Sequence, residues 1–453
     1  MPLTLDETIR LAQDSAIAAF QSRQEYQSRQ ASYETFEALR KPQLTLKVVP
    51  NYTRIVSDPG RDYVYLRNFD IFSTSAQLRL SQKVLPFGGE AFVGTQAVWS
   101  EFFRESASGY PRQFVASPLL MGYSHTLLGY NPFRWEKQVE DQRLKAARQQ
   151  HEYNLRCIAE EAAVRYVRLL CRQLTTLLRQ EELNLNDTVM AIAREKATIA
   201  IITQQELHTM ELQLQNSANL LAAARKEEQK ARTELASLLR MKQLPCDTAL
   251  LKIPELPSPT PYTAEEVATL AKNNSPAIQH QLAELTEAHH QEEKARKERG
   301  VNVGLDINLG LQQVNSPLGS AYKNQQVYAL GSLQLTIPLM DHGAAKKRHA
   351  AAVAWGERQE SALMETERLL VEDAVVTLQK LHDSRKMLES TEQTIKLAEA
   401  HFYETVENYA NGLSDINTFS LGQNRWVTAY TNYINALEEF WTNHYHLQTL
   451  VKN

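Results

Sequence analysis

The chain repeats one design twice, and this repetition constrains its fold more than any single motif. Thr4–Ala16 resembles Thr263–Ser275 at an offset of 259 residues, and residues 123–131 match residues 335–343 at an offset of 212. The difference between the offsets gives the first copy 47 extra residues, which fall between about Val56 and Val115. Tandem copies of this kind predict two similar structural units in one chain.

A proline-rich segment separates the two copies. We predict a first repeat over residues 1–244 and a second repeat over residues 262–453, joined by the linker 245–261. The linker holds five prolines, a density that favours extended backbone and disfavours helix.

Each copy begins with a segment of helical composition, over Leu3–Arg40 and Tyr262–Arg299. The second of these contains Pro276, which we expect at the first position of a restarted helix with Ser275 as its N-cap. The first segment has no internal glycine or proline, so we expect it to form one helix.

Helical composition returns later in each copy, for 70 residues over Tyr130–Ile199 and over His342–Asn411 and for about 40 more beyond. Gly412 interrupts the second run at a cost of about 1 kcal/mol relative to alanine. We expect the chain to reverse there through a positive φ angle, so that apolar stripes on both helical arms bury each other. The alternative is one continuous helix that tolerates the glycine.

Strands lie between the helical segments. Residues 301–312 and 327–339 alternate apolar and polar side chains, and we expect related strands over 43–52 and 115–127. The LPFGG sequence at 85–89 predicts a hairpin turn within the extra residues. Such strands fit a membrane β-barrel formed by 43–128 and 301–339, and they also fit a soluble sheet with one wet face.

Aromatic residues cluster around the strands of the first copy, where they suit the aromatic girdles of a membrane barrel or an ordinary core. They are Tyr63, Tyr65, Phe69, Phe72, Trp99, Phe102, Phe103, Tyr110 and Phe114.

Composition excludes several functions. The net charge of −4 argues against a nucleic-acid surface, and no run of 18 apolar residues predicts a transmembrane helix. The histidines His289, His290, His342 and His349 do not converge at ligand spacing, so we expect no metal and no other cofactor. No phosphate loop, nucleophile elbow or paired-carboxylate motif is present, and we expect no enzyme.

Three cysteines cannot pair fully, and we expect them to be small buried side chains.

The order of these motifs resembles the TolC-like outer-membrane efflux proteins over nearly the whole chain. The resemblance rests on LTLDETIRLA near the N-terminus, on IPLMDHGAAKKR and LLGYNPFRWEKQ before the long helices, and on YANGLSDINTFSLGQNRWVTAYTNYINAL after the second. It implies a mainly α fold with a membrane β-barrel: a homotrimeric duct of long antiparallel coiled-coil helices and transmembrane strands.

The same resemblance implies partners and a location. The partners would be a periplasmic adaptor, an inner-membrane transporter and the lipid of a Gram-negative outer membrane, with the helices in the periplasm. The N-terminus MPLTLDETIR has no basic n-region and no apolar h-region. Either the protein is cytoplasmic or a signal peptide has been removed, and the resemblance favours removal.

Three sets of residues are candidate sites. We predict adaptor docking at the two hairpin tips, over Ala200, Ile201, Ile202 and Thr203 and over Gly412, Leu413, Ser414 and Asp415. The resemblance places a tunnel entrance at Asp415, Asn417, Thr418 and Leu421; some family members carry acidic residues where this chain has Thr418 and Leu421. We expect Asn302, Asp306 and Asn308 to face the barrel lumen.

The sequence therefore predicts a passive outer-membrane channel-tunnel of a tripartite efflux or secretion system. A soluble coiled-coil scaffold is the alternative from another class, and a duct for type I protein secretion is the alternative within the export class. Six strands per chain would give 18 in a trimer, whereas four would give 12 and leave the extra hairpin outside the barrel.

Overall fold

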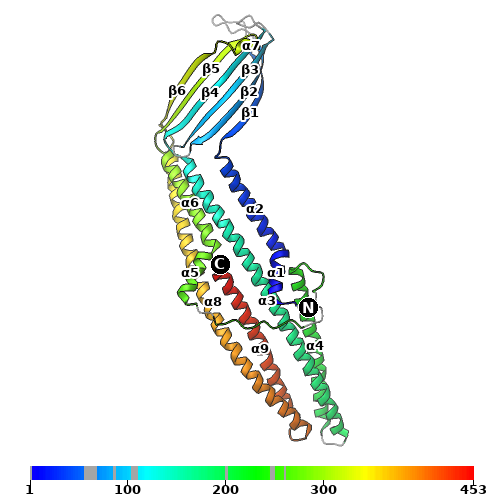
Figure 1. Cartoon of the computed structure of the whole chain (residues 1–453). Coiled ribbons are helices and arrows are strands. Elements are labelled where there is room, and N and C mark those ends of the chain that lie inside the picture. Colours follow the sequence, from blue (N-terminus) through cyan, green and yellow to red (C-terminus); the bar gives the residue numbers. More distant parts are fainter. Residues whose placement is uncertain are drawn as a thin grey trace. The chain divides into compact units, whose positions relative to one another are not determined.

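The computed structural model divides into two compact units, which we describe separately (Figure 1). Unit 1 comprises Met1–Gln27, Ala146–Gln279 and Leu363–Asn453, and unit 2 comprises Ser28–Lys145 and His280–Ala362. The structure describes residues 3–55, 69–84, 88–103, 111–198, 202–244, 250–259 and 262–452.

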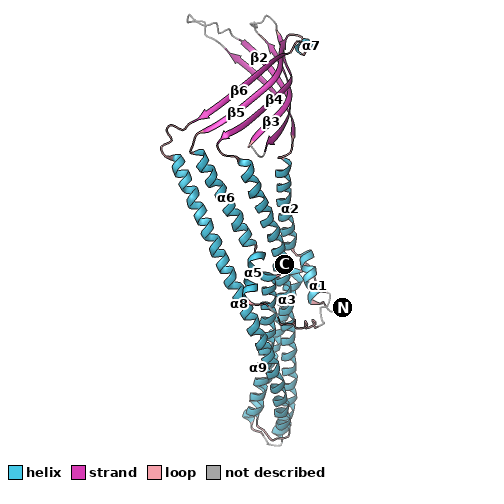
Figure 2. Ribbon diagram, turned by 60° about the vertical axis from the view of Figure 1, so that its left-hand side comes forward, coloured by secondary structure: helices cyan, strands magenta, loops and turns pink. Residues whose placement is uncertain are grey.

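Unit 2 contains one sheet of six antiparallel strands, arranged in the order of the sequence (Figure 2). The strands are β1 (Gln43–Ile55), β2 (Phe69–Val84), β3 (Gly89–Phe102), β4 (Arg112–Leu128), β5 (Asn302–Asn315) and β6 (Gln326–Thr336). A short helix, α7 (Leu318–Ala321), lies between β5 and β6 in the sequence. The four predicted strands are confirmed, although β6 ends three residues earlier than expected.

The extra residues of the first copy form part of this sheet. Strand β2 pairs with β1 from Gln43 opposite Ser81 to Ile55 opposite Phe69, and β3 pairs with both β2 and β4. Between β2 and β3, Gly88 has a φ of 75°. The predicted hairpin is therefore confirmed, and it is inserted into the sheet between the strands of the first copy.

Unit 1 is built from helices. Whole helices in it are α1 (Leu5–Ser15), α4 (Gln204–Leu238), α5 (Ala264–Asn274) and α9 (Ile416–Val451). Four more continue along the chain from one unit to the other: α2 (Ile17–Ala38), α3 (Pro132–Thr198), α6 (Pro276–Glu298) and α8 (Ala344–Ala410). Within the described residues of these helices, none is both long and apolar enough to cross a membrane.

The helix bounds repeat at the two predicted offsets. Helices α3 and α8 are both 67 residues long and are related by 212 residues at both ends. Helix α5 is related to α1 by 259 residues at both ends. The chain reverses after α8 as predicted, because α9 returns along it and packs Trp426 against Phe402 with ring centroids 4.9 Å apart.

The expectation of one helix over Leu3–Arg40 is wrong. Ala16 has φ −62° and ψ 142°, an extended conformation that ends α1, and α2 restarts at Ile17. The related Ser275 is also extended, and its Oγ accepts the backbone N–H of Ile278 at 3.4 Å, so the predicted cap before Pro276 is confirmed. Ala16 is 2% exposed, which indicates that packing fixes this break without any helix-breaking residue.

The cysteines only partly follow the prediction. Cys171 is buried in the core of unit 1, whereas Cys157 is half-buried, and Cys246 lies outside the described residues. Burial raises the pKa of the Cys171 thiol to about 12, so it packs as a small hydrophobic group.

Candidate functional sites at the sheet and the hairpin tips

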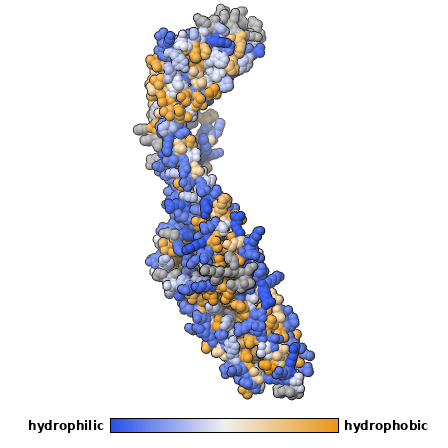
Figure 3. Space-filling view, turned by 45° about the vertical axis from the view of Figure 1, so that its right-hand side comes forward, coloured by the Kyte–Doolittle hydropathy of each residue, from blue (hydrophilic) through white to orange (hydrophobic). Residues whose placement is uncertain are grey.

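One face of the sheet is apolar and exposed. Its register aligns leucines across neighbouring strands, with Leu44 opposite Leu80 and Leu46 opposite Leu78. On the edge strand β6, Leu333 lies on this face and is 66% exposed. Figure 3 shows hydrophobic side chains gathered over part of the sheet. The apolar positions of β1 from Leu44 to Tyr52 cover about 26 Å at 3.3 Å per residue, the scale of a bilayer's apolar band.

Aromatic side chains lie at the far end of the same face from the leucines. Trp99 is opposite Thr74 and Phe114, and its ring lies 5.9 Å from that of Phe72 in an edge-on arrangement. Tyr52 is opposite Phe72 on the neighbouring strand. Of the predicted aromatic cluster, Tyr63, Tyr65 and Tyr110 lie outside the described residues. An apolar band bordered by a row of aromatic residues is typical of a lipid-facing barrel surface.

The opposite face of the sheet is polar. Asp306 pairs with Ser124 on one side and Ser332 on the other, and Asn308 pairs with Gly122. The third predicted lumen residue, Asn302, lies at the start of the same strand and has the same parity. All three therefore share one face, as the alternation predicted.

A cation that the sequence analysis missed lies on this polar face. The guanidinium of Arg79 stacks over the Phe92 ring at 3.8 Å and pairs with Glu90 at 3.2 Å. Gly122 makes room for this cluster, since an added Cβ there would lie 2.3 Å from Phe92 and 2.5 Å from the Asn308 amide oxygen. Arg79 lies between Leu78 and Leu80, and this alternation was the sequence signal that could have placed Arg79 on the polar face.

The two outer strands of the sheet, β1 and β6, each pair on one side only within the described chain. Their other edges present backbone N–H and C=O groups without strand partners, a state that proteins normally cover or pair. An open edge of this length is not viable in lipid.

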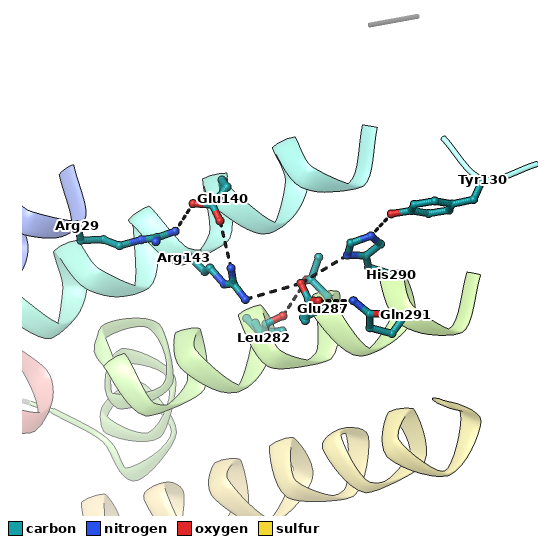
Figure 4. A network of polar contacts seen from close by, with 9 residues as sticks. Arg29, Tyr130, Glu140, Arg143, Leu282, Glu287, His290 and Gln291 are labelled. Carbon is teal, nitrogen blue, oxygen red and sulfur yellow. Dashed lines mark hydrogen bonds and ion pairs between the residues drawn. The ribbon is translucent and has the colours of Figure 1, made fainter. Parts of the chain in front are cut away.

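A polar network joins the helices of unit 2 (Figure 4). Glu140 on α3 binds Arg29 on α2, and Arg143 bridges Glu140 at 3.1 Å and Glu287 of α6 at 3.7 Å. His290 stands at the end of this chain of contacts and bonds to Tyr130. Burial lowers the pKa of His290, which favours a neutral ring that fills the space between aromatic neighbours.

The tip of the second hairpin is formed by Gly412. This residue has a φ of +75°, and its N–H donates to the Tyr409 carbonyl at 3.1 Å while the Leu413 N–H donates to the Asn408 carbonyl at 2.8 Å. These two bonds make the Schellman motif that ends a helix. The predicted positive φ angle is confirmed. Leu413 follows with 76% of its side chain exposed.

The residues after Gly412 begin α9. Asp415 is its N-cap: one carboxylate oxygen accepts the Thr418 N–H at 2.8 Å and the Thr418 hydroxyl at 2.6 Å. The hydrogen bonds from Thr418 lower the pKa of Asp415. Ser414 is half-buried, whereas Asn417 and Leu421 are exposed. Thr418 is therefore engaged in the cap and supplies no charge to the predicted entrance.

The tip of the first hairpin is described only in part. Ala200 and Ile201 lie outside the described residues. Thr203 is the N-cap of α4, and it makes a capping box with Glu206, whose carboxylate accepts the Thr203 N–H at 2.7 Å. Ile202 is partly buried against a hydrophobic cluster close to the tips.

We call this cluster the tip cluster; it consists of Leu178, Val189, Met190, Ala193, Met210, Phe402, Tyr409, Ile416, Phe419, Trp426 and Val427. Beside it, buried amides join the two hairpins: Gln423 donates to Asn186 at 2.8 Å and also bonds to Gln213. The sequence analysis missed this network, because single glutamines and asparagines carry no spacing signal.

The histidines that were considered as metal ligands stay apart. In the described part of the chain, no group of three or more His, Cys, Asp or Glu side chains is arranged to hold a metal ion. His290 is committed to Tyr130, and His342 occupies the turn before α8 with a φ of 53°.

No protein-family model and no curated protein matches the sequence. Solved structures do match its fold. The outer membrane protein VceC of Vibrio cholerae has a TM-score of 0.69 and 13% identity, over 99% of this chain and 95% of VceC. The outer membrane channel CmeC of Campylobacter jejuni has a TM-score of 0.71 and 11% identity, over 99% and 85%.

The MtrE outer membrane channel of Neisseria gonorrhoeae, solved in its open state, is similar over 99% of this chain and 88% of MtrE, with a TM-score of 0.67 and 15% identity. Identities this low establish the fold. The chain therefore has the fold of outer-membrane channel proteins, and the structural side of the predicted resemblance is confirmed.

Proposed function

We propose that this protein is the outer-membrane duct of a tripartite export system, and that it conducts substrates passively from an inner-membrane transporter and a periplasmic adaptor. The observation that carries the proposal is the two-sided sheet with open edges. Its apolar face suits lipid, its polar face suits a water-filled lumen, and its edges require further strands. The likeness to solved outer-membrane channels supports the same function.

Closure of the barrel requires other copies of the chain. A homotrimer would join β6 of each copy to β1 of the next and leave no strand edge in lipid. Because the extra hairpin is paired on both sides within the sheet, all six strands would enter the barrel and give 18 in the trimer. The two sequence repeats, 1–244 and 262–453, would then give the helical part a further pseudo-symmetry.

The hairpin tips are the proposed docking sites for the adaptor. At the second tip, Gly412 makes the turn and the exposed Leu413 offers an apolar contact near Asp415, the N-cap of α9. The first tip would contribute Ala200, Ile201, Ile202 and Thr203. The chemistry is association without reaction, so the free energy for transport would come from the inner-membrane partner.

Conductance tests the proposal. Detergent-purified protein is reconstituted into planar bilayers, and single-channel currents are recorded with neutral polymers of increasing size. Steady openings of uniform size, blocked only by polymers that enter a wide pore, would support an 18-strand duct. A protein that stays soluble and monodisperse without detergent and gives no current would overturn it in favour of a soluble scaffold.

Ion selectivity tests the lumen assignment. Asp306→Lys exchanges a negative for a positive charge on the polar face and should shift the reversal potential in a salt gradient toward anion selectivity, without lowering stability strongly. Asp383→Lys, at an exposed position of α8, is a control that carries the same charge change outside the strands. Unchanged selectivity in Asp306→Lys would show that this face does not line the pore.

A further inference from the structure

One histidine of α9 lies between carboxylates from two other helices. The Nδ1 atom of His446 is 2.9 Å from an oxygen of Glu160 on α3, and its Nε2 atom is 3.8 Å from an oxygen of Asp373 on α8. All three residues belong to unit 1. Both ring nitrogens therefore face acceptors, although a neutral imidazole has only one N–H to donate.

The protonated ring satisfies this arrangement. The imidazolium donates a hydrogen bond to Glu160 and its positive charge pairs with Asp373, which at 3.8 Å lies beyond hydrogen-bond distance, so both contacts are favourable once the second proton is bound. Glu160 is 23% exposed, Asp373 is 53% exposed and the His446 ring is 40% exposed, so the ring also exchanges protons readily with solvent.

The surroundings of the ring shift the pKa of His446 in both directions, and the net shift is upward. The hydrogen bond from His446 to Glu160 raises the pKa of His446 above its ordinary value of 6.5, and the charges of Glu160 and Asp373 act in the same direction. Burial of the ring and the charge of Lys380 on α8 oppose this shift. His446 therefore titrates above its ordinary value of 6.5.

The related position of the first copy carries no histidine. The offset of 212 residues relates His446 to Glu234 on α4, whose backbone carbonyl accepts a hydrogen bond from Arg165 at 2.8 Å. A permanently charged arginine of α3 thus binds the corresponding turn of α4, whereas on α9 the contact to α3 and α8 is made by a titrating side chain of α9 itself. The returning helices α4 and α9 are therefore held by different contacts, one that does not titrate and one that does.

We propose that His446 is a pH-dependent clamp, which fastens the C-terminal part of α9 to α3 and α8 when it is protonated and releases α8 when it is not. The sign follows from the raised pKa. The stabilisation is fully present below about 6.5, the ordinary value, and is lost as the pH rises through the higher value of the folded protein.

The proposed clamp rests on the contacts of His446 and does not depend on the proposed transport function. Should the proposed duct be correct, α3, α8 and α9 belong to its helical wall, and the clamp makes that wall firmer under acid conditions. Failure of the clamp would leave the duct intact, because the tests below use no conductance reading.

The first test measures the pKa of His446 directly. Hydrogen–deuterium exchange at the imidazole C2 position, read by mass spectrometry across pH 5 to 9, gives a midpoint for each histidine of the full chain in detergent. We expect a His446 midpoint above 6.5 that falls in Glu160→Gln and falls less in Asp373→Asn, since the Glu160 contact is shorter. A wild-type midpoint at or below 6.5 would overturn the proposal.

The second test measures the fastening of α9. Backbone hydrogen exchange of peptides from the last three turns of α9 is compared between wild type and His446→Gln at the same pH, which removes the intrinsic pH dependence of exchange. At pH 5.5 the variant should exchange about two- to fivefold faster, the factor expected for partly exposed ion pairs, and at pH 8.5 the two should agree. His382→Gln, at an exposed position of α8, is the matched control and should match wild type at both values. A ratio that does not change with pH would show that His446 only packs.

Discussion

The two helical hairpins of unit 1 have nearly the same length but bury different amounts of their returning helices. Helix α4 has 35 residues and α9 has 36, yet seventeen residues of α9 are buried against seven of α4. The buried set of α9 includes Phe419, Trp426 and Phe440, whereas Leu212 on α4 is 72% exposed. The second hairpin is therefore anchored more fully within its own chain than the first, whose α4 contributes only Met210 to the tip cluster.

Both hairpins also expose large apolar side chains, among them Leu397 on α8, which is 74% exposed. Leu177 on α3 and Leu212 on α4 are both more than half exposed, although the helices belong to a unit with a continuous core. Exposed leucines of this kind are better covered by a partner than left in water. This fits the proposed trimer, in which a neighbouring copy would cover what α4 leaves uncovered.

The largest expected effect is a difference in stability loss between two alanine variants, one on α9 and one at the related position of α4. Trp426 is 1% exposed and stacks on Phe402, so Trp426→Ala should destabilise the protein by about 3–5 kcal/mol. Its counterpart at the offset of 212 is Leu214, which is half-buried, and Leu214→Ala should cost only about 1 kcal/mol. Thermal unfolding of both variants in detergent measures the contrast. Equal losses would mean that α4 is covered as completely as α9 in the assembled protein.

A smaller effect is expected at the turn. Gly412 has a φ of +75° and open space around its missing Cβ, so Gly412→Ala should cost about 1–2 kcal/mol through backbone strain alone. Gly356 is buried inside α8, where an added Cβ would meet only the Glu292 carboxylate at an ordinary contact distance of 3.9 Å, and Gly356→Ala should instead stabilise by roughly 0.5–1 kcal/mol. Opposite signs in thermal unfolding would support this reading, and destabilisation by both variants would contradict it.

Much of the fold could be predicted, because it depends on the spacing of apolar residues along the chain and on the internal repeat. Alternation at 301–312 identified β5, and the single glycine at 412 identified the reversal after α8. The break at Ala16 could not be read locally, since alanine favours helix and only tertiary packing overrides it. Its relation to Ser275 was available from the repeat and would have predicted it.

The candidate sites were less predictable than the fold. Asp306 and Asn308 could be assigned to one face because strand parity fixes the face once the alternation is known. The contacts of Arg79, Gln423 and His446 depend on residues more than ten positions away in the sequence, and in the last two cases more than seventy. No spacing rule within one element connects such residues.

The smallest expected effect concerns the caps that begin the two returning helices. Thr203 caps α4 with a neutral hydroxyl, whereas the related Asp415 caps α9 with a carboxylate. Hydrogen bonds from Thr418 lower the pKa of Asp415, so its contribution is present above the ordinary value of 3.8 and is lost as the pH falls through the lower value of the folded protein. The substitution Asp415→Asn would keep the cap geometry without the charge.

Asp415→Asn should therefore be slightly less stable than wild type near pH 7. Below pH 3.8 the difference in stability between the two proteins should narrow, because protonation removes from wild type the charge that the variant lacks. Thr203→Ser keeps a hydroxyl cap on α4 and should show no such pH dependence, which makes it the matched control on the first hairpin. Thermal unfolding of the three proteins from pH 7 to pH 2.5 measures the difference. A gap between wild type and Asp415→Asn that stays constant over this range would mean that the charge of Asp415 contributes nothing to the start of α9, and that the two hairpins differ in burial alone.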